Sequence, residues 1–198
     1  MITTFNSWVK LKNKSWPSCL KHFHNCIVSK DQNLISLLNS CKQISQVSQI
    51  HSSMVKSGLD VVPFTLSKLL ASCVLVDIEY AASIFKDIQS PNLFMFNTML
   101  RGYSTSHDPK QEQAFVLFNY MRAQNVLLDQ FSFVSTLKSS ARLCATGFGR
   151  GIHSVVIQSG FYLFVNVKNA LLQFYCVYGN IRDAHQLFDE FSQERDLV

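Results

Sequence analysis

Apolar residues between positions 93 and 129 recur at the three-and-four spacing of a helix face, in two stretches. The first stretch runs roughly from Phe94 to Tyr103, and a polar segment with turn chemistry, residues 104–109, follows it. The second begins near Lys110, and its apolar stripe consists of Ala114, Leu117, Phe118 and Met121. We therefore predict two short helices joined by a turn. Such a pair cannot bury its apolar stripe alone, so it needs further helix pairs to pack against.

The chain repeats this pattern. The segment from Ile50 to Leu59 shares five of its ten residues with the segment from Ile152 to Phe161, at an offset of 102 residues. A small residue followed at four and seven positions by Phe and an apolar residue occurs three times, as Ala81/Phe85/Ile88, Ala114/Phe118/Met121 and Ala184/Phe188/Phe191. Periods of this length are typical of solenoids in which each helical hairpin packs only on its neighbours. The sequence thus predicts an all-α fold.

Several segments, in order and spacing, resemble the pentatricopeptide repeat proteins, in the plant subclass whose P, L and S units alternate. The matching segments are Phe96 to Tyr103 for a P unit, Phe131 to Lys138 with Gly151 to His153 for an L unit, and Asn169 to Leu172 with Phe188 to Glu190 for an S unit. The resemblance implies a right-handed superhelical solenoid of about five helix-turn-helix repeats. Its units would be residues 34–62, 63–92, 93–129, 130–164 and 165–196. Leu197 and Val198 resemble the start of a further unit, as in the N-terminal part of a longer protein.

Positive charge is concentrated before the repeats. Residues 1–33 carry five Lys and one acid, Asp31, and so account for +4 of the formal net charge of +5. A basic, Ser- and Thr-containing leader without acids before Asp31 is typical of an organelle transit peptide, although this one contains no Arg. We expect a mitochondrial location, with the chloroplast as the alternative. A leader with no targeting role is the other reading. The remaining residues carry only +1, so bulk charge is weak support for nucleic-acid binding.

The sequence contains no paired-carboxylate motif, nucleophile elbow or H-E-x-x-H motif, so we predict no enzymatic activity and no cofactor. The zinc signature of the deaminase-like domain that often ends members of this subclass is also absent. His51 and His153 recur at equivalent repeat positions, and we interpret them as packing or turn-facing residues. No apolar run reaches the length of a membrane span, so we expect no membrane partner.

Six cysteines and one glycine-rich run could suggest other chemistry. We expect Cys41, Cys73, Cys144 and Cys176 to lie in the first helix of a unit and to fill small core positions. The cluster of Cys19, His22, His24 and Cys26 does not have a standard zinc spacing, so we predict no metal site there. Gly147 to Gly151 lacks the Lys-Ser/Thr ending of a phosphate loop, and we predict an inter-helix turn.

The resemblance also implies which residues would read RNA, because members read one base per unit with the fifth residue of the first helix and the last residue of the unit. These residues would be Ser67 with Asn92 (adenine), Asn97 with Asp129 (uracil) and Asn169 with Asp196 (uracil). Val134 with Phe164 cannot read a base edge by hydrogen bonds, so this unit would not distinguish one base from another. Phe64, Phe94 and Phe131 occupy the second position and would stack on bases, whereas Asn166 departs from that pattern. The alternative for Asn97 and Asp129 is a purely local role as helix caps.

Three functional hypotheses follow. The first is a sequence-specific reader of single-stranded organellar RNA with the preference 5′-A-U-N-U-3′, acting in C-to-U editing, splicing or RNA stability, with an editing or processing factor supplied in trans. The second is a helical-repeat scaffold for protein partners, although the W-x-x-L-G signature of tetratricopeptide scaffolds is missing. The third is a truncated remnant with too few units to bind RNA usefully.

Overall fold

The computed structural model describes residues 33–106 and 110–195, and within these ranges it contains helices and no strands. Residues 33–40 are helical. The following helices are α3 (Ile44–Ser57), α4 (Pro63–Val76), α5 (Ile78–Asp87), α6 (Leu93–Thr105), η1 (Lys110–Glu112), α7 (Gln113–Ala123), α8 (Gln130–Arg142), α9 (Thr146–Gln158), η2 (Phe161–Leu163), α10 (Val165–Val177) and α11 (Ile181–Arg195). The predicted all-α fold is confirmed. The predicted leader and the Cys19–Cys26 cluster lie outside the described residues.

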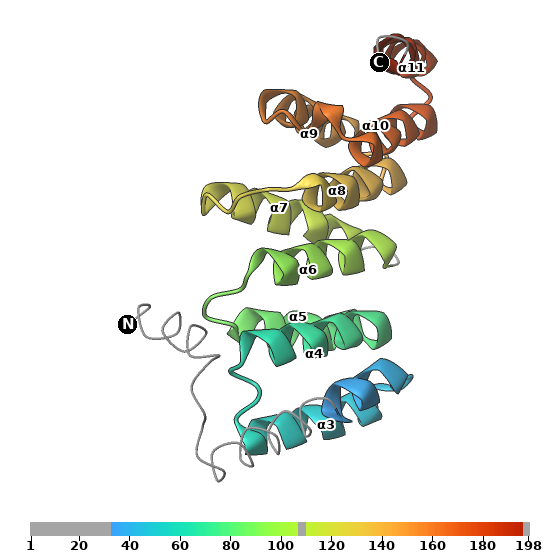
Figure 1. Cartoon of the computed structure of the whole chain (residues 1–198). Coiled ribbons are helices and arrows are strands. Elements are labelled where there is room, and N and C mark those ends of the chain that lie inside the picture. Colours follow the sequence, from blue (N-terminus) through green and yellow to red (C-terminus); the bar gives the residue numbers. More distant parts are fainter. Residues whose placement is uncertain (1–32, 107–109, 196–198) are drawn as a thin grey trace.

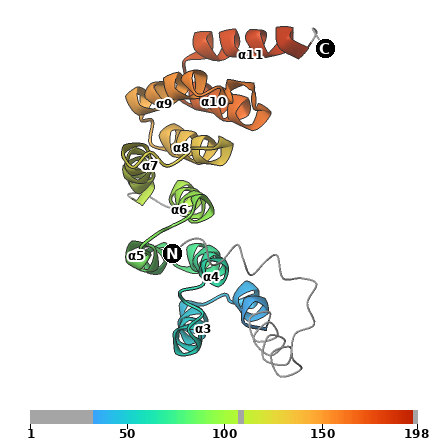
Figure 2. The same cartoon turned by 60° about the vertical axis from the view of Figure 1, so that its left-hand side comes forward.

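The helices alternate between two layers (Figures 1 and 2). Helices α4, α6, α8 and α10 form one layer, in which each contacts the next. Helices α5, α7 and α9 form the second layer, and the chain crosses between the layers at every turn. Each helix therefore contacts only its neighbours in sequence and the next unit, which is the arrangement of a solenoid.

Local sequence explains where individual helices begin and end. Pro63 is the first residue of α4, where its missing N–H is not needed for helix hydrogen bonding. The Asp77 carboxylate accepts hydrogen bonds from the backbone N–H groups of Glu79 and Tyr80 and so caps α5. Helix α3 ends at Ser57, and the following Gly58 adopts a left-handed conformation with φ 68°, which is favourable for glycine.

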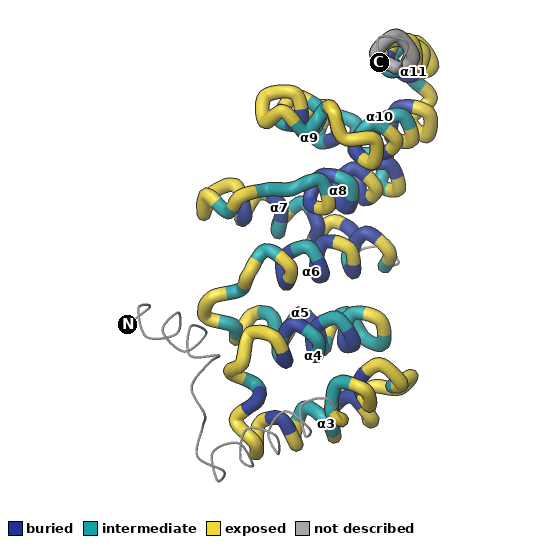
Figure 3. The backbone as a smooth tube through the Cα atoms, viewed as in Figure 1, coloured by how far each residue is buried: buried dark blue, intermediate teal, exposed yellow. Residues whose placement is uncertain are grey.

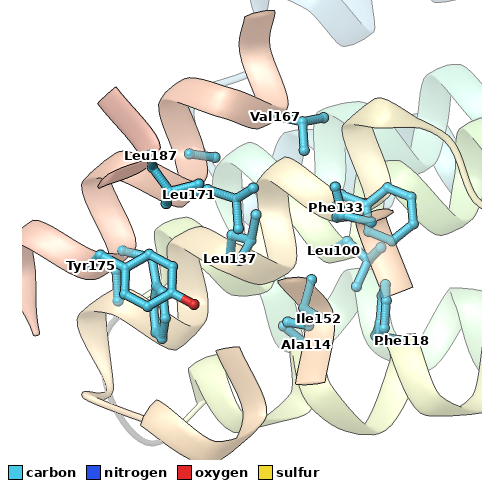
Figure 4. Packing of buried hydrophobic residues seen from close by; sticks show 14 of the residues in the cluster. Leu100, Ala114, Phe118, Phe133, Leu137, Ile152, Val167, Leu171, Tyr175 and Leu187 are labelled. Atoms are coloured by element: carbon cyan, nitrogen blue, oxygen red, sulfur yellow. The ribbon is translucent and has the colours of Figure 1, made fainter. Parts of the chain in front are cut away.

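The predicted apolar stripes are buried between the layers (Figure 3). In α6, Met95, Phe96, Met99 and Leu100 are buried, and in α7 so are Ala114, Phe118 and Met121. The core consists of an N-terminal and a C-terminal cluster, and Phe85, Tyr103 and Leu117 pack against both. The hydrophobic interior is therefore continuous along the solenoid, and Figure 4 shows its C-terminal part.

The predicted turn at Gly147–Gly151 is wrong, because these residues lie within α9. The turn is made instead by residues 143–145, where Cys144 has a φ of 50°. Gly149 is buried against the ring of Phe174, and a Cβ added to it would overlap that ring. The glycine therefore permits close helix packing rather than a change of chain direction.

The prediction that four cysteines fill the core holds only for Cys73, which is fully buried. Its burial, with the Asp77 charge nearby, raises the pKa of the thiol to about 12, so it packs as an apolar group. Cys144 and Cys176 are exposed, and Cys41 is intermediate. Cys41 and Cys144 follow their helices rather than lie within them. Cys176 falls one residue beyond the buried Tyr175, and one residue on a helix turns the side chain by about 100°.

Candidate nucleic-acid interface

The candidate base-contacting residues lie in the first helical turns of one layer of the solenoid. Ser67, Asn97, Val134 and Asn169 are the fifth residues of α4, α6, α8 and α10, and Phe64, Phe94 and Phe131 are the second residues of α4, α6 and α8. Residues three apart share a helix face, so each Phe lies beside the fifth-position residue of its own helix. Since consecutive helices of this layer contact one another, these positions form a row along the solenoid.

Asn97 and Asp129 form a direct pair although they are 32 residues apart in sequence. Asn97 Nδ2 lies 3.0 and 2.9 Å from the two carboxylate oxygens of Asp129. Asp129 immediately precedes α8, and its Oδ1 accepts a hydrogen bond of 2.9 Å from the backbone N–H of Ser132. Asp129 is therefore a helix cap, as the local alternative requires, but it also binds Asn97. Asn97 lies inside α6 and does not cap it.

The Ser67 and Asn92 pair is arranged similarly but is held more loosely. Asn92 caps α6 by accepting a hydrogen bond of 2.9 Å from Met95 N–H, and its Nδ2 lies 3.4 Å from Ser67 Oγ. Ser67 is buried, and its hydroxyl donates to the Pro63 carbonyl at 2.7 Å. Asn92 is thus the exposed member of this pair.

The structure describes the other two candidate pairs less completely. Asn169 is exposed near the start of α10, while Asp196 lies outside the described residues. Val134 is half-buried in α8 and offers no polar atom, and Phe164 stacks on Phe161 at a ring-centroid distance of 5.2 Å. An apolar pair therefore occupies these two candidate positions.

The three candidate stacking residues are aromatic side chains that are more than half exposed to solvent. Phe64, Phe94 and Phe131 are 62%, 52% and 57% exposed. Asn166 occupies the equivalent position of α10 and is also exposed. Lys68 Nζ lies 5.6 Å above the Phe64 ring, a cation–π contact that places positive charge beside the row. Lys68 is a residue that the sequence reasoning missed.

A second missed residue is Ser132, which is fully buried at the third position of α8. Its hydroxyl donates to Asn97 Oδ1 at 2.7 Å. The spacing of Asp129 and Ser132 is that of a capping box, which is a visible sequence signal. The contact with Asn97 is not visible in the sequence, because it joins residues 35 positions apart across a helix interface.

The recurrent histidines pack against tyrosines. His51 Nδ1 lies 2.8 Å from the Tyr80 hydroxyl, and His153 Nδ1 lies 2.9 Å from the Tyr175 hydroxyl. The two histidines are in α3 and α9, far apart along the solenoid, and do not form a joint site.

In the described ranges, no group of three or more His, Cys, Asp or Glu side chains could hold a metal ion. Within the same ranges, every helix is too short or too polar to span a bilayer.

His153 should make folding stability sensitive to pH. Burial lowers its pKa below the ordinary value of 6.5, although the charges of Glu190 and Asp183 act in the opposite direction. The unfolded chain therefore binds more protons just below pH 6.5, and stability should fall as the pH drops from there toward the folded pKa. We expect His153→Gln to flatten this part of the profile, measured by urea unfolding across pH 5–7. Parallel profiles for the two proteins would contradict this expectation.

Comparisons with known proteins show which family this chain resembles. The sequence model of the family described as PPR repeat matches residues 168–195. A pentatricopeptide repeat-containing protein of Arabidopsis thaliana described as mitochondrial is 50% identical over 167 residues, which are 84% of this chain and 29% of the relative. A second, described as chloroplastic, is 38% identical over 168 residues, 83% of this chain and 22% of the relative. A third, described as mitochondrial, is 33% identical over 171 residues, 83% of this chain and 25% of the relative.

The chain thus spans less than a third of the length of each of these relatives. The similarity to the first of them nevertheless extends over 84% of this chain. The repeat signatures, the two-layered helical solenoid and these relatives together show that the chain belongs to the pentatricopeptide repeat family.

Proposed function

We propose that this chain binds single-stranded RNA in a sequence-specific manner, with one base for each repeat. The observation that carries the proposal is the Asn97–Asp129 contact, which brings the two expected readout residues within 2.9 Å of each other. Exposed phenylalanines occupy the second positions of α6 and α8. A polar pair for a base edge and an aromatic ring for a base face are the two elements that RNA recognition needs.

The family resemblance assigns the Asn97 pair to uracil, and the chemistry of the pair is compatible with that base. Both Asp129 oxygens lie at nearly equal distances from Asn97 Nδ2, so one amide hydrogen is shared between them. The second amide hydrogen and a lone pair of Oδ1 remain for a ligand. Uracil presents carbonyl acceptors beside an N3–H donor, and a free amide group can pair with one acceptor and with that donor.

The expected order of contacts along the chain is 5′-A-U-N-U-3′. Asn92 with Ser67 would meet adenine, Asn97 with Asp129 the first uracil, and Asn169 with Asp196 the second. Val134 and Phe164 cannot hydrogen-bond a base edge through their side chains, so the third position would accept any base. Stacking on exposed aromatic rings contributes about 1–3 kcal/mol for each base. Such stacking would compensate for the small net charge of +1 on residues 34–198.

We place this activity in an organelle, with the mitochondrion first and the chloroplast as the alternative. Two of the relatives described above are called mitochondrial and one chloroplastic. The RNA-processing outcome would be C-to-U editing, splicing or RNA stability, with the editing or processing factor acting in trans. The assignment to the subclass of alternating P, L and S units, and the five unit boundaries, belong to the same proposal.

Exchanging one readout pair tests the proposal. In the double variant Asn97→Ser with Asp129→Asn, the second pair takes the composition of the first, and Asn still caps α8. We expect the preferred second base to change from uracil to adenine by roughly tenfold, a typical discrimination for a hydrogen-bonded base edge. The measurement is sequencing of the RNA retained from a randomised single-stranded pool. The other three positions serve as the internal control.

If the double variant retains the same RNAs as the parent, the readout proposal is wrong. If the parent crosslinks to no RNA but isolates stable protein partners, the scaffold hypothesis is favoured. Absence of both RNA and protein partners would favour a remnant without binding function.

A further inference from the structure

Ser132 joins the two members of the Asn97–Asp129 pair from a third position. It is fully buried, and its hydroxyl lies 2.7 Å from Asn97 Oδ1 and 3.0 Å from Asp129 Oδ1. Its oxygen also accepts the backbone N–H of Asp129 at 3.3 Å. The single hydroxyl hydrogen has its shorter contact with Asn97. Ser132 therefore donates its hydrogen bond to the side-chain carbonyl oxygen of Asn97, the residue that we expect to contact the base.

These contacts determine how the Asn97 amide is oriented. A carboxylate only accepts hydrogen bonds, so Asn97 must turn its NH2 group toward Asp129. Its carbonyl oxygen then faces Ser132, which supplies a donor. Reversing the amide would place two acceptors, Oδ1 and the carboxylate, against each other. With Asp129 bound to one end and Ser132 to the other, the amide plane is fixed at both atoms.

The Ser67–Asn92 pair lacks this third contact. The third residue of α6 is Met95, which offers no hydroxyl and is buried in the core. The Asn92 to Ser67 contact is correspondingly long, at 3.4 Å. The two pairs therefore differ in the number of hydrogen bonds that hold them, and the difference follows the identity of the third residue of the next helix.

We propose that Ser132 is a positioning residue that sets the base discrimination of the Asn97–Asp129 pair, an inference that rests on the RNA-reading function proposed above. By fixing the amide plane, Ser132 holds the free amide hydrogen and the Oδ1 lone pair in one arrangement. Without it, the amide retains the Asp129 contact but can rotate about it. A rotating amide can adapt to the edges of other bases, so discrimination falls more than affinity.

The test compares Ser132→Ala with Ser140→Ala in the 198-residue chain. Ser140 is equally buried on α8, but its hydroxyl donates only to the Thr136 carbonyl, at 3.0 Å. Base preferences are read by sequencing the RNA retained from a randomised single-stranded pool. For Ser132→Ala, we expect the preference at the second base to fall about fivefold, the ratio that one ordinary hydrogen bond supports. Preferences at the other positions, and all preferences of Ser140→Ala, should be unchanged.

Ser132→Thr retains a hydroxyl donor, so it should keep most of the preference and guards against a simple folding defect in the Ala variant. The inference is overturned if Ser132→Ala keeps the parental preference, or if Ser132→Thr loses it equally. If the parent itself shows no preference at the second base, the proposed RNA-reading function fails, and the inference fails with it. If the parent shows a preference at the second base and Ser132→Ala keeps it, the role proposed for Ser132 is wrong, while the proposed RNA-reading function stands.

Discussion

Replacing Phe118 with Ala should lower the free energy of unfolding by about 3–5 kcal/mol, as is typical for a buried aromatic side chain. The Phe118 ring is 1% exposed, and its centroid lies 6.0 Å from that of Phe133 and 6.3 Å from that of Phe148. Figure 4 shows Phe118 and Phe133 within the buried cluster. Phe118 therefore connects α7 to α8 and α9. Its loss would leave a cavity where these helices meet. Urea unfolding followed by circular dichroism measures the effect.

Phe188→Ala is the matched control. Phe188 occupies the same place in the repeated signature as Phe118, four residues after a buried Ala, but it is 59% exposed on α11. Its removal should cost about 1 kcal/mol or less, as for most surface substitutions. If both variants lost the same free energy of unfolding, the position of the Phe in the repeated signature, and not its burial, would determine how much it stabilises the fold.

Replacing Gly149 with Ala should destabilise the fold by about 1–3 kcal/mol, in the range found for overpacked cores. The new Cβ would overlap the ring of Phe174, which is itself fully buried and has little room to move. This overlap outweighs the gain of up to about 1 kcal/mol that Ala normally brings to a helix interior. Thermal and urea unfolding of the variant give the magnitude.

Gly151→Ala should have the opposite sign. Gly151 lies in the same helix, is exposed, and would meet no heavy atom within 4 Å of its added Cβ. The variant should therefore gain about 0.5–1 kcal/mol from reduced backbone entropy in the unfolded chain. A loss of stability in Gly151→Ala, or a gain in Gly149→Ala, would contradict the assigned packing of α9 on α10.

The glycine run illustrates where sequence reasoning failed. Three glycines between positions 147 and 151 are a strong local turn signal. The packing of α9 against Phe174 overrides that signal, because a close helix contact also requires a residue without a side chain. The prediction for Cys176 is wrong for a geometric reason, because one residue along a helix turns the side chain by about 100°, away from the side on which Tyr175 is buried.

Burial of the repeated Phe depends on whether a further helix packs over it, and the signature alone does not contain that information. Phe118 is covered by α8 and α9, and Phe85 is partly covered by α6, where its ring lies 5.3 Å from that of Phe96. Phe188 lies on α11, beyond which the described part of the chain has no further helix. The same local sequence therefore has three different degrees of burial.

The sequence by itself determined the helices, their apolar faces and the repeat, because each depends on side chains a few residues apart on one helix. It also predicted which Asn, Asp and Phe positions would be equivalent from unit to unit. Only the tertiary structure decided that Asp129 both caps α8 and binds Asn97, and that Ser132 contacts both. These contacts join residues 32 and 35 positions apart. Their geometry depends on how α8 packs against α6, and no local pattern specifies that packing.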